Sequence, residues 1–97
     1  MDKNIVELLL DYDISELEIG DMLNMAPMLD IVSFEEFRDN CLLLVEFGYP
    51  KSDLDFLFLA NPNIFVRSTQ DLKKDLKKLC ADCDDIELAL KQDPNVI

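Results

Sequence analysis

Hydrophobic positions recur with a helical period along almost the whole chain of 97 residues. Apolar residues three and four positions apart give each segment one hydrophobic face, which is the pattern of an amphipathic helix packed against a core. The pattern predicts six helices and no strand. The predicted ranges are residues 2–11, 15–26, 33–47, 52–60, 68–81 and 84–92.

Short polar residues stand where four of these helices begin. A serine suits the N-cap because its hydroxyl accepts a hydrogen bond from a free backbone N–H of the first turn. The predicted N-caps are Ser15, Ser33, Ser52 and Ser68. Glu18 completes a capping box with Ser15, and Gly48 supplies a stop after the third helix.

A 32- to 35-residue pattern is repeated around three prolines, Pro27, Pro62 and Pro94. In each copy the positions eight, five and four before the proline, and two after it, are apolar. The first two copies stay in register further on, at an offset of 35. The matched pairs are Ser33/Ser68, Phe37/Leu72, Cys41/Leu76, Leu44/Leu79 and Val45/Cys80. A period of this length is typical of helical repeats, and it predicts one all-α domain of about three stacked helix pairs, units 2–32, 33–67 and 68–97.

Each proline predicts the end of a unit. Proline disfavours helical geometry in the residue before it, so we expect Ala26, Asn61 and Asp93 to end the second, fourth and sixth helices. The apolar residue two positions after the proline should then fold under the helix pair through a tight turn. Pro-containing turns therefore separate the predicted units.

The fifth predicted helix, 68–81, is an outer helix with a single buried face. Its apolar stripe consists of Leu72, Leu76, Leu79, Cys80 and Cys83. Lysines 73, 74, 77 and 78 lie on the opposite side and, with Arg67, form the one basic strip of the chain. We expect this strip to be a solvated outer face, because Asp71 and Asp75 neutralise it and no aromatic residue interleaves with it to stack bases.

The net charge is −12 and is unevenly distributed. Residues 1–60 contain 14 Asp and Glu but only Lys3, Arg38 and Lys51, whereas residues 61–97 are nearly neutral. An acidic surface repels phosphate backbones, so we expect no direct nucleic-acid binding. The negative charge either keeps a helical protein soluble or attracts a protein partner that has a basic surface.

Residues that carry catalytic or metal chemistry are scarce. Histidine is absent, and two glycines cannot form a Gly-rich phosphate loop. Cys80 and Cys83 have the C-x-x-C spacing, but no second pair of ligands accompanies them. The sequence predicts no catalytic residues, no cofactor and no metal site, so a non-enzymatic protein is expected.

The expected location is the reducing cytoplasm. Three cysteines are an odd number, the N-terminus lacks the basic and apolar regions of a signal peptide, and no transit peptide is visible. No apolar run approaches the roughly 20 residues that span a bilayer, so no membrane partner is expected.

Roughly residues 14–97, and most specifically 44–80, resemble the repeat of the mitochondrial transcription termination factor family. The resemblance lies in Gly48-Tyr49-Pro50, in Asn61-Pro62-Asn63-Ile64-Phe65 and in the Ser-capped helix that follows. It implies a right-handed solenoid of helix pairs, each followed by a short 3₁₀ turn, with a basic groove for nucleic acid. We carry over the architecture and not the nucleic-acid binding, since this chain is acidic and has about three units.

Two helices have apolar residues outside their main stripe, and these are the predicted contacts for a protein partner. Leu43 and Phe47 lie beside the stripe of the third helix, and Phe56 and Leu59 beside that of the fourth. Packing between neighbouring repeats also explains such residues. Where they stay exposed, they favour a protein–protein interaction module, and the end units could also join copies of the chain in a homo-oligomer.

The alternative is an acidic inhibitor that imitates nucleic acid, of the phage or mobile-element type. Spaced carboxylates would then replace phosphates in the basic cleft of an enzyme that handles DNA or RNA. The predicted residues are Glu7, Asp11, Asp13, Glu16, Glu18, Asp21, Glu35, Glu36 and Asp39. A second alternative is the nucleic-acid binding that the family resemblance implies, through the basic strip of helix 68–81.

Overall fold

The computed structural model describes residues 1–97, and every regular element in it is a helix, so the predicted all-α class is confirmed. None of the helices combines the length and the apolar composition needed to cross a membrane. The α-helices are α1 (Lys3–Asp11), α2 (Glu16–Met25), α3 (Phe34–Glu46), α4 (Leu54–Ala60), α5 (Thr69–Asp82) and α6 (Ile86–Gln92). The 3₁₀ helices are η1 (Pro27–Asp30), η2 (Lys51–Asp53) and η3 (Pro62–Val66).

Three of the four predicted serine caps are present. Ser15 accepts a hydrogen bond from the Glu18 backbone at 3.2 Å, and the Glu18 carboxylate accepts one from the Ser15 N–H at 3.0 Å. Ser33 and Ser68 likewise accept from the third residue of their helices. Gly48 follows α3 with φ of 109°, a left-handed conformation that glycine adopts without steric cost.

Ser52 is the predicted cap that is wrong. It lies inside η2, and α4 begins only at Leu54, without a side-chain cap. Pro50 precedes η2 in an extended conformation, and the 3₁₀ turn of Lys51–Asp53 separates it from the start of α4. The last helix also begins later than predicted, at Ile86, where the Asp85 carboxylate caps it.

The prolines end helices as expected. Ala26, Asn61 and Asp93 are the C-cap residues of α2, α4 and α6. Pro27 and Pro62 then begin η1 and η3, where their fixed φ suits the first helical position and their missing N–H costs nothing. Pro94 lies in a turn near the end of the chain.

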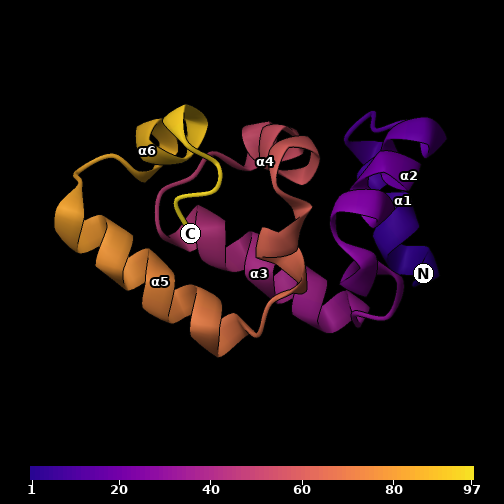
Figure 1. Ribbon diagram of the computed structural model, residues 1–97, viewed down its shortest axis with the longest axis horizontal. Helices are drawn as coiled ribbons and strands as arrows, with labels where there is room; N and C mark the ends of the chain where they lie inside the picture. Colours follow the sequence, from indigo (N-terminus) through magenta and orange to yellow (C-terminus); the bar gives the residue numbers. More distant parts are fainter.

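The helices lie in two rows (Figure 1). Along the upper edge of the view are α2, α4 and α6, and below them α3 and α5 lie side by side and run in the same direction. Contacts join α1 to α2 and α3, α3 to α5, and α2 to α4. The segment η3 lies between the rows, since it contacts α2 and α4 of one row, α3 of the other, and η1.

One continuous apolar core of 21 buried residues connects the rows. At its centre are three phenylalanine rings, Phe37, Phe58 and Phe65, whose centroids are 4.7 to 5.7 Å apart. They come from α3, α4 and η3, so this cluster locks the two rows and a 3₁₀ segment together.

The predicted stripe of α5 is partly wrong. Leu72, Leu76 and Leu79 are buried, but Cys80 is exposed and Cys83 is half-buried. Because α5 lies at the edge of its row and packs mainly against α3, only a narrow face is covered. Position 80 lies outside that face.

Candidate functional site

The middle helix of the upper row exposes two large apolar side chains. Phe56 and Leu59, three positions apart on α4, keep 39% and 38% of their surface accessible. Leu54, Leu57 and Phe58 on the other side of this helix are buried. We call Phe56 and Leu59 the α4 patch. Both were predicted from the sequence as partner contacts.

The other two predicted apolar contacts are not on an open surface. Leu43 is buried, with 7% of its surface accessible, and Phe47 is half-buried against the core. The reason is the central place of α3, which contacts α1 as well as α5. Leu43 therefore belongs to the core, and its proposed role in binding a partner is corrected.

The nine predicted acidic contacts are mostly exposed. Glu7, Asp11, Asp13, Glu16, Asp21, Glu35 and Asp39 are exposed, and Glu18 and Glu36 are half-buried. Glu18 is engaged in the capping box of α2. Asp39 lies 3.5 Å from the Arg38 guanidinium. The remaining carboxylates form no ion pair, so they keep their charge available at the surface.

The basic strip is smaller than predicted. Lys73, Lys74, Lys77 and Lys78 are exposed on α5. Arg67 is turned away from them, since it pairs with Asp75 and donates a hydrogen bond of 2.8 Å to the Ile97 carbonyl. The hydrogen bond from Arg67 lowers the pKa of Asp75.

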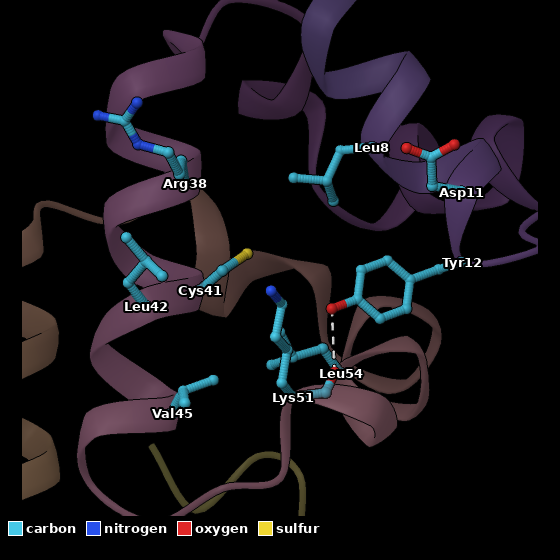
Figure 2. A pocket seen from close by; sticks show the side chains of 9 residues that line it. All are labelled: Leu8, Asp11, Tyr12, Arg38, Cys41, Leu42, Val45, Lys51 and Leu54. Atoms are coloured by element: carbon cyan, nitrogen blue, oxygen red, sulfur yellow. Dashed lines mark hydrogen bonds between the residues drawn. The ribbon is translucent and has the colours of Figure 1, made fainter.

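Sequence reasoning missed a groove between α1 and α3 with a volume of about 450 Å³ (Figure 2). Six of its nine lining residues are apolar: Leu8, Tyr12, Cys41, Leu42, Val45 and Leu54. The others are Asp11, Arg38 and Lys51. We call it the α1/α3 groove. Its α3 wall has the spacing i, i+3, i+4, i+7, but periodicity alone cannot distinguish an uncovered stripe from a buried one.

Tyr12 closes one side of the α1/α3 groove. Its hydroxyl donates a hydrogen bond of 2.9 Å to the Lys51 carbonyl, and its ring meets Phe58 edge-on at a centroid distance of 5.3 Å. Burial raises the pKa of Tyr12. The hydrogen bond ties the end of α1 to η2, so the groove has a fixed wall between segments 39 residues apart.

Cys41 lies at the floor of the α1/α3 groove, and its thiol has low reactivity. Burial raises the pKa of its thiol to about 12, because a thiolate is disfavoured away from water. A neutral thiol is a poor nucleophile and a poor metal ligand. The floor of the groove is thus an apolar surface suited to contact with hydrocarbon.

The cysteine and carboxylate side chains form no group of three or more that could hold a metal ion. All three cysteines are free. The Cys83 thiol donates a hydrogen bond to the Leu79 carbonyl at 3.0 Å, which is a helix-end contact.

Comparison of the chain with models of protein families, with curated proteins and with solved structures finds no match. The resemblance to the mitochondrial transcription termination factor repeat therefore remains a hypothesis from the sequence.

Proposed function

We propose that this chain is a non-enzymatic protein–protein interaction module built on an acidic helical-repeat scaffold. The observation that carries the proposal is the α4 patch. Phe56 and Leu59 stay exposed on a helix whose other side is fully buried, and such a pair is a suitable anchor for a partner. Half-buried Asp55 directly precedes Phe56 in sequence and contributes an acidic rim.

The proposed scaffold is a short right-handed solenoid of three helix pairs. Its support is the equivalence of α3 and α5, which run side by side in the same direction (Figure 1). Their N-caps, Ser33 and Ser68, line one shallow depression, as expected of matching positions in stacked repeats.

Asparagines of the middle proline segment support the same stacking. The Asn63 side chain donates to the Met25 carbonyl at 3.1 Å, toward the first unit. The Asn61 side chain donates to the Pro94 carbonyl at 2.8 Å, toward the third. The three proline segments thus connect to one another, which is the behaviour of repeats in register.

The proposed partner has a basic surface, and the proposed compartment is the reducing cytoplasm. Residues 1–60 carry a net charge of −11, so long-range attraction would speed the approach of a cationic protein. Free cysteines fit a reducing environment.

Affinity capture of binding proteins tests the module and its binding face. The double variant Phe56→Asp/Leu59→Asp should lose the partner that the unaltered chain retains. Leu10→Asp is the matched control, because Leu10 is similarly exposed at 44% but lies on α1. A partner retained equally by all three proteins would rule out the α4 patch.

The second candidate function is an acidic inhibitor that imitates nucleic acid. It is supported by seven exposed carboxylates on α1, α2 and α3 and in the loop between the first two helices. Attraction between opposite charges would supply most of its affinity, so salt should release the partner steeply. Glu16→Lys/Asp21→Lys should abolish capture, and the captured protein should be an enzyme of DNA or RNA. Capture that survives 1 M salt favours the α4 patch instead.

A homo-oligomer through the end units is a further version of the interaction proposal. Light scattering at rising concentration tests it directly. Two copies that each carry −12 repel one another at long range, so any self-association should strengthen as salt is added. A strict monomer at every salt concentration would remove this version.

A further inference from the structure

The α1/α3 groove contains most of the basic side chains of the acidic part of the chain. Residues 1–60 contain only three basic side chains, and two of them, Arg38 and Lys51, line the groove. They stand over a floor and walls made of six apolar side chains. A positive charge beside an apolar surface favours a ligand that has an anionic head and an apolar body. The surrounding region has a net charge of −11, so these two cations are the groups in the groove that can attract an anion.

Lys51 is the cation that is free to bind a head group. Its ammonium forms no ion pair, whereas Arg38 lies against Asp39 and the Phe34 ring. Figure 2 shows the Lys51 side chain extending into the opening, between Cys41 and Tyr12. The backbone beneath it is held by the Tyr12 hydroxyl. An ammonium next to apolar walls interacts with an anion more strongly than one in bulk water.

The apolar lining forms a continuous strip along α3. Cys41, Leu42 and Val45 follow Arg38 at three, four and seven positions, which corresponds to about 10 Å of helix. Leu42 keeps 54% of its surface exposed although the core lies beside it, and Leu8 extends from the α1 side toward α3 (Figure 2). The volume of about 450 Å³ falls in the range of small-molecule sites.

We propose that the α1/α3 groove binds a free, unbranched alkyl carboxylate of medium chain length. The carboxylate pairs with the Lys51 ammonium, and the hydrocarbon lies along Leu8, Leu42 and Val45. Asp11 on the α1 wall repels the head group and so orients the ligand toward Lys51. No covalent step is involved, and the site shares no residue with the α4 patch.

The overall charge makes this assignment sharply testable. A chain of net charge −12 attracts cationic amphiphiles at every surface. Non-specific binding would therefore favour decyltrimethylammonium, whereas the α1/α3 groove should favour decanoate. A second copy of the chain is a poor occupant, because it carries the same −12.

Isothermal titration with octanoate, decanoate and decyltrimethylammonium below their micellar concentrations tests the proposal. Decanoate should bind at one site per chain and at least tenfold more tightly than decyltrimethylammonium. Each buried methylene contributes about 0.8 kcal/mol, so decanoate should bind roughly fifteenfold more tightly than octanoate. Amide chemical shifts should move at Leu8, Leu42 and Val45.

Two matched pairs of variants locate the ligand. Lys51→Gln should weaken decanoate binding about tenfold, whereas Lys3→Gln, which removes the third cation of the same region, should change it less than twofold. Leu42→Ser should weaken it similarly, and Leu17→Ser, at a more exposed leucine outside the groove, should not. Equal effects within either pair, tighter binding of the cationic amphiphile, or no decanoate binding would overturn the proposal.

Discussion

Asn40 shows how one buried residue can tie a helix to the chain segment packed against it. It is completely buried on α3, and its amide donates to the carbonyls of Phe65 at 3.0 Å and Arg67 at 2.9 Å. Its side-chain oxygen accepts a hydrogen bond of 2.8 Å from the Thr69 hydroxyl. Every polar atom of this side chain is therefore paired. The partners are Phe65 in η3, Arg67 in the linker that follows η3, and Thr69 at the start of α5.

Replacing Asn40 by leucine should be strongly destabilising. The change removes the donors of two carbonyls, the buried one of Phe65 and the partly buried one of Arg67, and an unsatisfied buried group costs about 1–3 kcal/mol. We expect the free energy of unfolding to fall by about 2–5 kcal/mol in urea denaturation. Asn24→Leu, at an exposed asparagine of α2, is the control. Similar stability of the two variants would show that the Asn40 network contributes little.

The cysteines should differ widely in reactivity. Cys80 is exposed, whereas Cys41 is buried with a pKa of about 12. At pH 8 we expect iodoacetamide to modify Cys80 readily and Cys41 on the order of a hundredfold or more slowly, because the thiolate is the reactive form. Mass spectrometry of timed samples, with Cys80→Ser as the control, measures both rates. Rapid labelling of Cys41 in the folded protein would contradict its burial.

The ion pair between Arg67 and Asp75 predicts a dependence of stability on pH. The pKa of Asp75 is lower in the folded chain than the ordinary value of about 3.9. Its contribution is therefore present above that ordinary value and is lost as the pH falls through the folded pKa.

Thermal unfolding between pH 5 and pH 2 measures this contribution. The Tm of the unaltered chain should fall more steeply than that of Asp75→Asn. Asp84→Asn, at an exposed carboxylate without an ion pair, should behave like the unaltered chain. Parallel curves for all three proteins would show that the pair adds no stability.

At the scale of elements, each helix owes its position to one buried face. Helix α4 has only seven residues, too short to be stable in isolation. It persists because Leu54, Leu57 and Phe58 are buried and because η2 and η3 fix its two ends. A short helix stabilised in this way keeps its outer side chains, Phe56 and Leu59, available to a partner.

Shortening a side chain on the buried side of α4 should reduce stability more than shortening one on its exposed side. Leu57→Ala creates a cavity at a fully buried site and should lower the free energy of unfolding by about 2–5 kcal/mol. Leu59→Ala removes a partly exposed side chain and should cost well under half of that. Chemical denaturation measures both. A larger loss for Leu59→Ala would mean that the α4 patch is part of the core.

At the scale of the whole molecule, charge governs which partners can approach. The basic strip contains four exposed lysines on α5, whereas the whole chain carries a net charge of −12. Arg67 is removed from the basic strip by Asp75 and the Ile97 carbonyl. Four cations reach few phosphates, and the acidic surface repels the rest of a nucleic acid.

We therefore expect no detectable binding to single- or double-stranded DNA at physiological salt. Fluorescence anisotropy with labelled oligonucleotides is the measurement. Micromolar or tighter affinity that disappears in Lys73→Glu/Lys74→Glu/Lys77→Glu/Lys78→Glu would contradict this expectation. That result would restore the function implied by the family resemblance.

The sequence by itself determined the helices and where they end. Periodicity placed six helices, and serine, glycine and proline set most of their limits, because caps and proline act within a few residues of the chain. The exceptions are informative. Ser52 is not a cap, because residues 51–53 form a 3₁₀ turn before α4, and the hydrophobic pattern did not indicate this turn.

Only the tertiary structure decided which apolar residues remain exposed. Leu43 and Leu59 are alike in sequence, yet Leu43 is buried on α3, which contacts both α1 and α5, while Leu59 on α4 keeps 38% of its surface exposed. The α1/α3 groove, the Asn40 network and the contacts of Arg67 with Asp75 and Ile97 likewise join residues that are distant in sequence, as much as 46 positions for Leu8 and Leu54 in the groove. Such contacts depend on how helices pack, and a periodic pattern specifies a face but not the element that covers it.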